Sequence, residues 1–443
     1  MVVAADSLRR MSYDAIIIGA GIIGANLGFE MSKAGFKTLN IDKNPAAGYG
    51  STANSCAIVR THYSTWAGVA MAFEGFHFWQ NWDEYLEIED ERGNAGFVQC
   101  GGVYIGDNSR YEDKVLPLFD EIGIEYERWN VDQLTDRLPG IDIGEHTPPK
   151  RPEDDEFWED PPRQITSAVH SPIAGYITDP QLATHNLQRA AEAKGGEFWF
   201  RAEVSDIRTK GGRVVGVDLA DGRSADAPIV VNVAGPHSFV INDMAGVTDS
   251  MNIKTKALRH EVHHVPSPDN LNFEKDGMLV GDDDLGTYFR PEVANHILVG
   301  SQDPVCDPQI WVQDPDEFDH TISEDQWRAQ VLRLARRLPA LGVPSEKKGV
   351  VDLYDVSDDW IPIYDKTDLA GFYLMIGTSG NQFKNSHIAA YCMVQLIKEV
   401  ESGRDHDTDP VKVKMPYTGL EMDMSVFSRN REINEASSFS VLG

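Results

Sequence analysis

The first apolar runs of the chain are short and separated by glycines. Residues 13–18 are apolar apart from Asp14 and predict a buried parallel strand, residues 24–34 predict a helix, and residues 37–41 predict a second strand. A strand, a helix and a strand in this order form a βαβ unit. The chain is therefore expected to begin with a nucleotide-binding fold.

The same pattern returns late in the chain. Residues 229–234 form another apolar run, and residues 372–376 form one that leads into a glycine-containing turn and a helical pattern ending near Lys398. Between them, residues 251–345 alternate between apolar and polar positions, as antiparallel strands do, with one helix expected at residues 324–338. The strands of one nucleotide sheet thus come from distant segments, and a second domain is expected as an insertion.

The composition of the chain limits the kinds of molecule that it is expected to bind. The 443 residues include 70 Asp and Glu against 40 Lys and Arg, a net charge of −30, which argues against nucleic acid or an anionic membrane as the main partner. An anionic substrate would need a local basic pocket. The four cysteines form no close pair, so the sequence predicts neither a disulfide framework nor a zinc ribbon, and it favours a cytoplasmic protein.

The N-terminal segment resembles a signal peptide only superficially. Two arginines precede the apolar run, but Asp14 interrupts the approach and the glycines stand at the spacing of a nucleotide motif. No run reaches the roughly 18 apolar residues that a transmembrane helix needs. We expect no export and no transmembrane segment.

A dinucleotide-binding fingerprint follows the first strand. Gly19, Gly21 and Gly24 stand in the spacing GxGxxG, and Asp42 ends the next strand. Gly19 permits a tight turn, Gly21 lets a pyrophosphate approach the helix N-terminus, and Gly24 allows close packing of the helix on the strand. Asp42 can accept the ribose hydroxyls, so a dinucleotide is expected.

Three further segments favour FAD over NAD, since the fingerprint reads only the ADP half that both share. They are a small-residue loop at 50–56, the end of the strand at 229–234, and the segment 377–384, which again offers backbone N–H groups at a helix start. The residues expected to bind the cofactor are Gly19, Gly21, Ile22, Gly24, Asp42, Lys43, Gly50, Ser51, Thr52, Ser55, Cys56, Val204, Ala234, Gly235, Gly377, Gly380, Asn381, Gln382, Phe383 and Lys384.

With these motifs in place, the chain resembles the D-amino-acid oxidase superfamily, in the branch of sarcosine oxidase, glycine oxidase and dimethylglycine dehydrogenase. The resemblance covers residues 13 to about 398 and rests on the segments GAGIIG, GSTANSCAIVR, GYITDPQL, VVNVAGP, TYFRPE, LYDVSDDWIPIYD and GTSGNQFK. It implies FAD-dependent oxidation of the C–N bond of a small amino or imino acid by hydride transfer to the flavin. A second dinucleotide fingerprint and a redox cysteine pair are both missing, so no NAD partner is expected.

The expected fold class is α/β + β, a Rossmann-like FAD-binding domain with an inserted antiparallel-sheet substrate domain. The predicted boundaries assign residues 11–100, 175–250 and 346–400 to the FAD-binding domain, residues 101–174 and 251–345 to the substrate-binding domain, and residues 401–443 to a C-terminal extension.

The resemblance also indicates the substrate site. Arg60 and Lys384 occupy the places where family members anchor a substrate carboxylate, and both are predicted to do so here. His62 and Tyr288 are candidates for hydrogen bonding in the pocket, with a structural role equally open for each. Arg290 could pair with a second carboxylate or with a surface acid, and this choice stays open.

One apparent zinc-binding motif is not expected to bind a metal. Residues 260–264 read HEVHH and match the zinc-binding pattern HExxH, but they alternate like a strand. Four strand residues separate the outer histidines by about 13 Å, too far to share an ion. We predict no metal.

Departures from the family sharpen two expectations. The positions that attach flavin covalently in dimethylglycine dehydrogenase and in monomeric sarcosine oxidase correspond to Asn54 and Val351, so FAD is expected to be non-covalent. Leu298 stands where monomeric sarcosine oxidase carries the Lys that favours reaction with oxygen, which slightly favours a dehydrogenase over an oxidase. The electron acceptor, whether a quinone, an electron-transfer protein or oxygen, stays open.

Two other functions fit the same fold. A 2-hydroxy acid dehydrogenase would use the same carboxylate anchor and would need a base, for which His62 is a candidate. A flavin-binding subunit without its own chemistry would show no bleaching of the flavin by substrate. Fold alone does not choose among the three.

Overall fold

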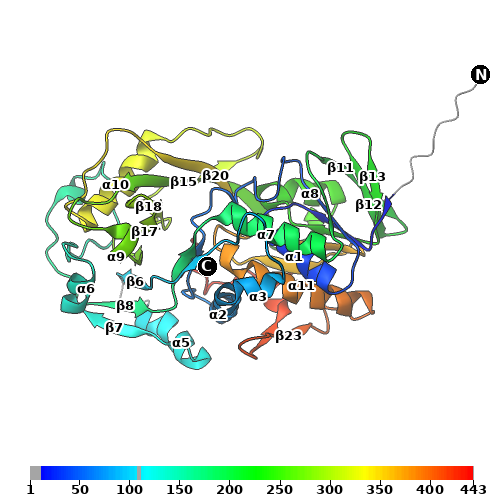
Figure 1. The fold of residues 1–443 in the computed structure, drawn as a ribbon, viewed down its shortest axis with the longest axis horizontal. Coiled ribbons are helices and arrows are strands. Elements are labelled where there is room, and N and C mark those ends of the chain that lie inside the picture. The colour runs from blue at the N-terminus through cyan, green and yellow to red at the C-terminus, as the bar shows by residue number, and fades with distance from the viewer. Residues whose placement is uncertain (1–10, 107–110, 443) are drawn as a thin grey trace, which may run out of the picture.

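Two large sheets form the core of the computed structural model, which describes residues 11–106 and 111–442. The strands of the antiparallel sheet lie on the left in Figure 1, and the helices that cover the other sheet lie on the right. The first sheet has six strands. Its order is β10 (Glu197–Trp199), β3 (Thr38–Ile41), β2 (Ala15–Ile18), β14 (Ile229–Asn232), β22 (Phe372–Ile376) and β21 (Ile363–Lys366). All neighbours are parallel except β21, which runs antiparallel to β22. The predicted nucleotide sheet is thus confirmed, including its assembly from distant segments.

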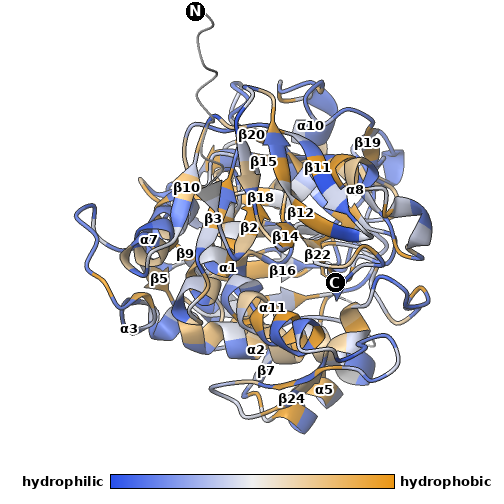
Figure 2. Cartoon of the chain, turned by 90° about the vertical axis from the view of Figure 1, so that its right-hand side faces the viewer, coloured by the Kyte–Doolittle hydropathy of each residue, from blue (hydrophilic) through white to orange (hydrophobic). Residues whose placement is uncertain are grey.

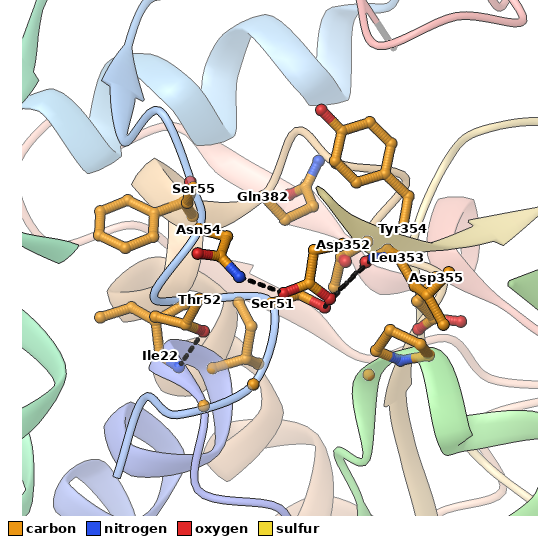
Figure 3. Close-up of a pocket in the computed structure, with 18 of the residues that line it drawn as sticks. Ile22, Ser51, Thr52, Asn54, Ser55, Asp352, Leu353, Tyr354, Asp355 and Gln382 are labelled. Atoms are coloured by element: carbon orange, nitrogen blue, oxygen red, sulfur yellow. Dashed lines mark hydrogen bonds between the residues drawn. The ribbon is translucent and has the colours of Figure 1, made fainter. Parts of the chain in front are cut away.

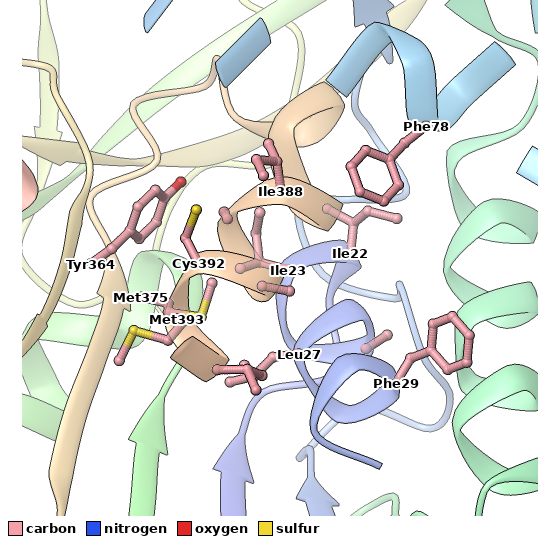
Figure 4. Packing of buried hydrophobic residues seen from close by; sticks show 14 of the residues in the cluster. Ile22, Ile23, Leu27, Phe29, Phe78, Tyr364, Met375, Ile388, Cys392 and Met393 are labelled. Atoms are coloured by element: carbon pink, nitrogen blue, oxygen red, sulfur yellow. The ribbon is translucent and has the colours of Figure 1, made fainter. Parts of the chain in front are cut away.

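Helices cover one face of this sheet. Helix α1 (Ile22–Lys33) packs between α7 (Pro180–Ala193) and α11 (Ser386–Glu401). The apolar residues of α1 and α11 pack in one cluster with those of the strands, as Figure 4 shows for Leu27 of α1, Met393 of α11 and Met375 of β22. The Asp179 side chain caps α7 by accepting from the Gln181 and Leu182 N–H groups, which explains why this helix begins where it does.

The second sheet has nine strands and is mostly antiparallel. Its order is β19 (Ile310–Val312), β15 (Thr255–Pro266), β18 (His296–Ser301), β17 (Thr287–Glu292), β16 (Leu279–Asp282), β6 (Gly102–Ile105), β8 (Ser167–Ser171) and β7 (Glu127–Asn130), with β20 (Gly349–Ser357) paired to β15. Helix α10 (Glu324–Arg337) packs against β15, β17 and β18. The segment HEVHH lies within β15, so it is a strand as the sequence indicates.

Strand β20 marks where the two domains meet. It pairs with β15 over nine residues and therefore belongs to the antiparallel sheet, whereas the sequence boundary at residue 346 places it in the FAD-binding domain. The period-two pattern of β20 is the same in either sheet, so the sequence carries no signal for its partner. We propose that the FAD-binding domain resumes after residue 357.

Smaller sheets complete the fold. A β-hairpin is formed by β11 (Val204–Lys210) and β12 (Arg213–Leu219), joined through Gly211 and Gly212 in left-handed conformations. It forms a sheet with β13 (Ser224–Asp226) and β1 (Met11–Ser12). Strands β4 (Ile58–Val59), β9 (Gly175–Ile177) and β5 (Phe97–Val98) form another, and β23 (Lys412–Lys414) pairs with β24 (Glu421–Asp423).

The remaining helices are short or broken. The apolar stripe at residues 65–86 forms two helices, α2 (Trp66–Gln80) and α3 (Trp82–Leu86), because Asn81 leaves helical geometry and its side chain donates to the His77 carbonyl. The others are α5 (Leu116–Ile122), α6 (Val131–Arg137), α8 (Ser238–Ala245) and α9 (Phe273–Asp276). Apolar residues concentrate in the central strands and polar ones on the periphery (Figure 2). No helix in residues 11–106 and 111–442 is long and apolar enough to cross a membrane.

Candidate active site

A cavity of about 810 Å³ runs between the two sheets. Its lining comes from the turn after β2, the loop at 50–56, the start of the segment after β14, the facing strands β15, β17 and β20, and the loop before α11. The carboxyl ends of parallel strands are where open α/β sheets bind their ligands. The predicted site residues that line the cavity are Gly19, Gly21, Ile22, Gly24, Asp42, Lys43, Gly50, Ser51, Thr52, Ser55, Cys56, Arg60, Val204, Ala234, Gly235, Tyr288, Gly380, Asn381, Gln382, Phe383 and Lys384.

The glycine turn after β2 has the geometry that its spacing predicts. Gly19 has a φ of +117°, and a Cβ atom there would lie 2.3 Å from the Val233 carbonyl oxygen. A Cβ at Gly24 would lie 2.3 Å from the Gly19 carbonyl oxygen, so α1 approaches the turn closely. At Gly21 a Cβ would meet only Thr52 Oγ1, at 3.1 Å, and would point into the cavity lining. The N-terminus of α1 therefore faces the cavity with bare backbone.

The acidic residue after β3 is held in place by backbone N–H groups. Asp42 accepts from Ala20 N at 2.7 Å and from Asn44 N at 2.8 Å. Its neighbour Lys43 forms an ion pair with Asp316, which also lies 3.0 Å from His237 Nε2. The loop that carries Asp316 thus closes the same end of the cavity.

The loop at 50–56 crosses from the glycine turn to the second sheet (Figure 3). Thr52 Oγ1 accepts from the Ile22 N–H at 3.1 Å, which ties the loop to α1. Ser51 Oγ donates to Asp352 Oδ1 at 3.0 Å, and Asn54 Nδ2 donates to Asp352 Oδ2 at 2.6 Å. Asp352 is a lining residue that sequence reasoning missed, since its role depends on β20 lying opposite the loop.

The segment before α11 contributes most of its predicted residues but not its first glycine. The Gly377 N–H donates to Asp355 Oδ2 at 2.6 Å and Gly377 does not line the cavity, whereas Gly380 and the residues that follow do. Burial raises the pKa of Asp355 to about 7, although the Gly377 and Thr378 N–H groups oppose the shift. Asp355, which also lines the cavity, therefore holds the start of this turn through its carboxylate, a role that the sequence does not reveal.

The two predicted anchor cations converge on one aromatic ring. The Arg60 guanidinium lies 4.7 Å from the centre of the Tyr63 ring, and Lys384 Nζ lies 4.9 Å from it. Arg60 is 8% exposed and Lys384 is 3% exposed. Burial, and then the charge of Arg60, lower the pKa of Lys384 well below its usual value. A carboxylate placed between them would supply the missing negative charge.

A polar row lies on the facing strands. Tyr288 OH lies 3.5 Å from Cys56 Sγ, and burial raises the pKa of Tyr288 well above its usual value, so its hydroxyl stays protonated. Tyr354 stacks on His260 with ring centres 4.3 Å apart, and His260 Nε2 pairs with Asp303 at 2.8 Å. His260 and Tyr354 line the cavity and were missed, although the spacing of alternate residues in β15 and β20 could have placed both on one face.

Two other sequence candidates lie elsewhere. His62 is fully buried but does not line the cavity; its ring stacks on Tyr104 with centres 4.1 Å apart. Arg290 pairs with Glu292 at 3.1 Å and donates to the Cys56 carbonyl, so it supports the loop at 50–56 and does not line the cavity.

Leu298, the residue predicted to affect the reaction with oxygen, also lies outside the cavity. Leu298 pairs with Arg290 in the β17–β18 ladder, while Tyr288 pairs with Gly300. Gln302, just beyond β18, is the lining residue from this part of the chain. Gln302, rather than Leu298, is thus the residue after β17 whose position could affect a reaction inside the cavity.

The residues present fit an FAD molecule. The bare helix N-terminus at Gly21 suits a pyrophosphate, and Asp42 at the end of β3 suits the ribose hydroxyls. The cavity continues without a break from this turn to Arg60 and Tyr288, which gives an extended dinucleotide room to place its flavin beside the second sheet.

Comparison with known proteins gives the same assignment. Residues 14–396 match the family described as FAD dependent oxidoreductase. The chain is 26% identical over 226 residues to the N-methyl-L-tryptophan oxidase of Yersinia pestis, covering 50% of this chain and 53% of that protein. It is 23% identical over 248 residues to the alpha-glycerophosphate oxidase of Enterococcus casseliflavus, covering 53% and 37%. The chain thus spans about half the length, or less, of these curated relatives.

Solved structures share the fold over nearly the whole chain. The L-proline dehydrogenase of P. horikoshii superposes with a TM-score of 0.74 at 18% identity, covering 95% of this chain and 97% of that chain. The glycine oxidase of Geobacillus kaustophilus superposes with a TM-score of 0.71 at 18% identity, covering 96% and 100%.

Proposed function

The chain belongs to the FAD-dependent oxidoreductase family, and we propose that it oxidises the C–N bond of a small amino or imino acid. The observation that carries the proposal is the pair of buried cations, Arg60 and Lys384, which line the same cavity as the dinucleotide turn. Buried charges require partners, and a substrate carboxylate is the partner that suits both.

The cations would fix the reacting end of the substrate. Charge-assisted hydrogen bonds from Arg60 and Lys384 hold the carboxylate, and this places the adjacent amine at a set distance from the anchor. FAD, when bound, supplies the acceptor for the hydride. The same two charges favour the neutral form of the substrate amine, whose lone pair the reaction needs. No additional base is therefore required of the chain.

The opposite wall offers contacts for the amine and for a short side chain. The protonated hydroxyl of Tyr288 provides a hydrogen-bonding group, and Val262 and Leu279 provide apolar surface in the cavity lining. This mixture suits a small N-methylated or cyclic amino acid. It also agrees in kind with the names of similar proteins, which include a glycine oxidase, an L-proline dehydrogenase and an N-methyl-L-tryptophan oxidase.

Oxidation of a 2-hydroxy acid is less well supported by the geometry. That reaction wants a base for the hydroxyl proton, and His62 does not line the cavity. His260 does, but its carboxylate partner Asp303 raises the pKa of His260 although burial opposes the charged form. The His260 Nε2 atom is already paired with Asp303 at 2.8 Å, so we favour the amine substrate, which needs no base from the chain.

The acceptor of the electrons is part of the proposal. Among the described residues, Arg60, Lys384 and Lys43 are the Lys and Arg side chains that line the cavity, and Lys43 is taken up by Asp316 at the dinucleotide end. With Arg60 and Lys384 both paired to a substrate carboxylate, neither is left unpaired to favour superoxide formation. We therefore favour a dehydrogenase over an oxidase.

Anaerobic mixing of the purified yellow protein with candidate substrates tests the proposal. We expect small secondary amino acids such as sarcosine or proline to bleach the flavin absorbance, and their methyl esters to fail because the carboxylate is gone. Bleaching by 2-hydroxy acids alone would favour the alternative enzyme. A flavin that none of these compounds reduces, but that dithionite does, would indicate a binding subunit without its own chemistry.

A further inference from the structure

The last described residues of the chain lie at the centre of the molecule, between the two sheets, where Figure 1 marks the C-terminal end. Val441 and Leu442 are 6% and 5% exposed, and both line the cavity. They are the lining residues that come from beyond α11 in the described part of the chain. Residues 437–442 are called the wall segment below.

The wall segment touches the proposed anchor directly. Arg60 Nη2 donates to the Val441 carbonyl oxygen at 2.6 Å, and Arg60 Nη1 donates to the His62 carbonyl oxygen. A guanidinium carries five N–H groups in one plane, so these two contacts fix its orientation and leave donors for a carboxylate. The Arg60 guanidinium also lies over the Tyr63 ring, which limits its movement further.

The segment is held firmly on both sides of this contact. Val441 packs in one apolar cluster with Leu258, Val356 and Trp360. The Ser438 N–H donates to Ser64 Oγ at 3.1 Å. Upstream, Arg431 pairs at 2.7 Å with Asp359, whose side chain is fully buried. These contacts make the segment a fixed wall of the cavity and distinguish it from a loose end lying over the surface.

We infer that the wall segment sets the position of the carboxylate and the size of the substrate. In this inference, which rests on the proposed function, the Val441 carbonyl is a positioning group for Arg60, and the Leu442 side chain is a specificity-determining surface. A bulky residue at position 442 would narrow the cavity beside the anchor, and removal of the carbonyl would let the guanidinium turn away.

The test measures binding of two inert carboxylates, acetate and benzoate, to the FAD-loaded protein through their perturbation of the flavin absorption spectrum. The variants are a chain ending at Ser440, Leu442→Trp and Leu442→Ala. Ile433→Ala is the control, since Ile433 lies in the same tail, is 49% exposed and does not line the cavity.

We expect the shortened chain to bind acetate roughly 10-fold more weakly, because a hydrogen bond that orients a charged group is lost. Leu442→Trp should weaken benzoate at least 10-fold more than acetate, and Leu442→Ala should shift the preference toward benzoate. Ile433→Ala should match the unaltered protein. If the shortened chain loses FAD, the two Leu442 variants decide the question.

An unchanged ratio of the benzoate and acetate dissociation constants in both Leu442 variants would overturn the inference. The result is independent of turnover. A protein that binds both carboxylates and shows the predicted selectivity, yet oxidises no amine, would refute the proposed function and leave the wall segment as described.

Discussion

The two ends of the cavity are built in different ways. At the dinucleotide end, Gly19 and Gly21 act through backbone geometry and Thr52 through its hydroxyl. All three lie within one short stretch of the chain, and the Ile22 N–H donates to Thr52 Oγ1 across only 30 residues. At the substrate end, Arg60 contacts Val441 across 381 residues and Cys56 contacts Tyr288 across 232. The first end is a local motif, and the second exists only after the whole chain has folded.

The two ends also treat charge differently. The dinucleotide end offers uncharged N–H groups at the start of α1, which suit an anion without burying a cation. The substrate end places Arg60 and Lys384 side by side in a chain whose net charge is −30, and burial disfavours the charged form of Lys384. Such a pair costs stability unless a ligand neutralises it. This cost is itself an argument that the pair serves binding.

Adding a side chain at Gly21, where the helix N-terminus faces the cavity, should have the largest effect of the changes considered. In Gly21→Val the side chain would project beside Thr52 into the space proposed for the pyrophosphate. We expect colourless protein with less than roughly a tenth of the normal flavin content, because the phosphate can no longer approach the helix N-terminus.

Flavin content per folded chain, read from the visible and ultraviolet spectra, measures this change. Gly342→Ala is the control, because a Cβ atom there has no neighbour within 4 Å. A yellow Gly21→Val protein would mean that the turn at Gly21 does not hold the cofactor.

A second all-or-none prediction concerns attachment of the cofactor. Acid precipitation should release all the yellow colour into the supernatant. Asn54 is hydrogen-bonded to Asp352 at 2.6 Å, and Val351 has a hydrocarbon side chain, so neither position can form the family's covalent bond to flavin. Colour that stays in the washed pellet would contradict this, and would direct attention to Cys56 in the same lining.

The substrate end should lose activity without losing FAD. Arg60→Met and Lys384→Met should each lower kcat/KM by roughly 10²-fold or more, since each removes a charge-assisted contact with the carboxylate. Steady-state kinetics and flavin content are measured together. Lys348→Met is the control, because the Lys348 side chain is 60% exposed. Wild-type rates of flavin reduction at low substrate in both variants would place the anchor elsewhere.

The pH dependence of carboxylate binding separates the two cations. Protonated Lys384 binds the anion, so affinity is greatest below the pKa of Lys384 in the free protein and falls as the pH rises through it. Because burial and Arg60 lower that pKa, the fall should begin well below the ordinary lysine value of 10.5. The dissociation constant of acetate should rise toward tenfold per pH unit there.

Two variants provide the comparison. Lys384→Met should remove this pH dependence and leave weak, flat binding. Arg60→Met should move the fall to higher pH, because the repulsion that helps to lower the pKa of Lys384 is gone. Identical profiles in the Lys384→Met and unaltered proteins would exclude Lys384 from the binding of the anion.

The same contrast explains what the sequence could predict. Strand, glycine turn and acidic residue occur in order between residues 15 and 42, so the nucleotide fold and its contact residues could be identified directly. Arg60 and Lys384 were recognised through family motifs. His62 was assigned to the pocket because it follows Arg60 closely, yet its ring stacks on Tyr104 and does not line the cavity.

The residues that were missed depend on tertiary neighbours. Asp352 and Tyr354 face the cavity because β20 pairs with β15, a partner that no local pattern specifies. Val441 and Leu442 occur in a polar tail without periodicity and become cavity walls only through contacts with Arg60 and Trp360. The segment HEVHH was correctly read as a strand, but the cavity-facing role of His260 needed the position of Tyr354.

The smallest expected effect concerns oxygen. Reduction of oxygen passes through an anion formed beside the flavin, and a fixed positive charge there accelerates it. Because a bound carboxylate would pair with both Arg60 and Lys384 and offset part of their charge, we expect slow reoxidation of the substrate-reduced protein in air-saturated buffer and rapid reduction of an artificial quinone or dye. Hydrogen peroxide formed at the rate of turnover would overturn the assignment as a dehydrogenase.

The geometry of the β17–β18 hairpin allows a sharper test, because it distinguishes Leu298, which lies outside the cavity, from Gln302, which lines it. Leu298 lies opposite Arg290 and outside the cavity, so Leu298→Lys should leave the oxygen reaction unchanged. Gln302 lines the cavity and is 7% exposed, so Gln302→Lys should quicken reoxidation by about 3- to 10-fold, the effect of a charge in a partly screened site. Stopped-flow mixing of both reduced variants with oxygen compares them directly. If only Leu298→Lys accelerates reoxidation, the flavin must react with oxygen near Leu298, outside the cavity that Tyr288 and Gln302 line. The proposed location of the substrate site would then be wrong as well.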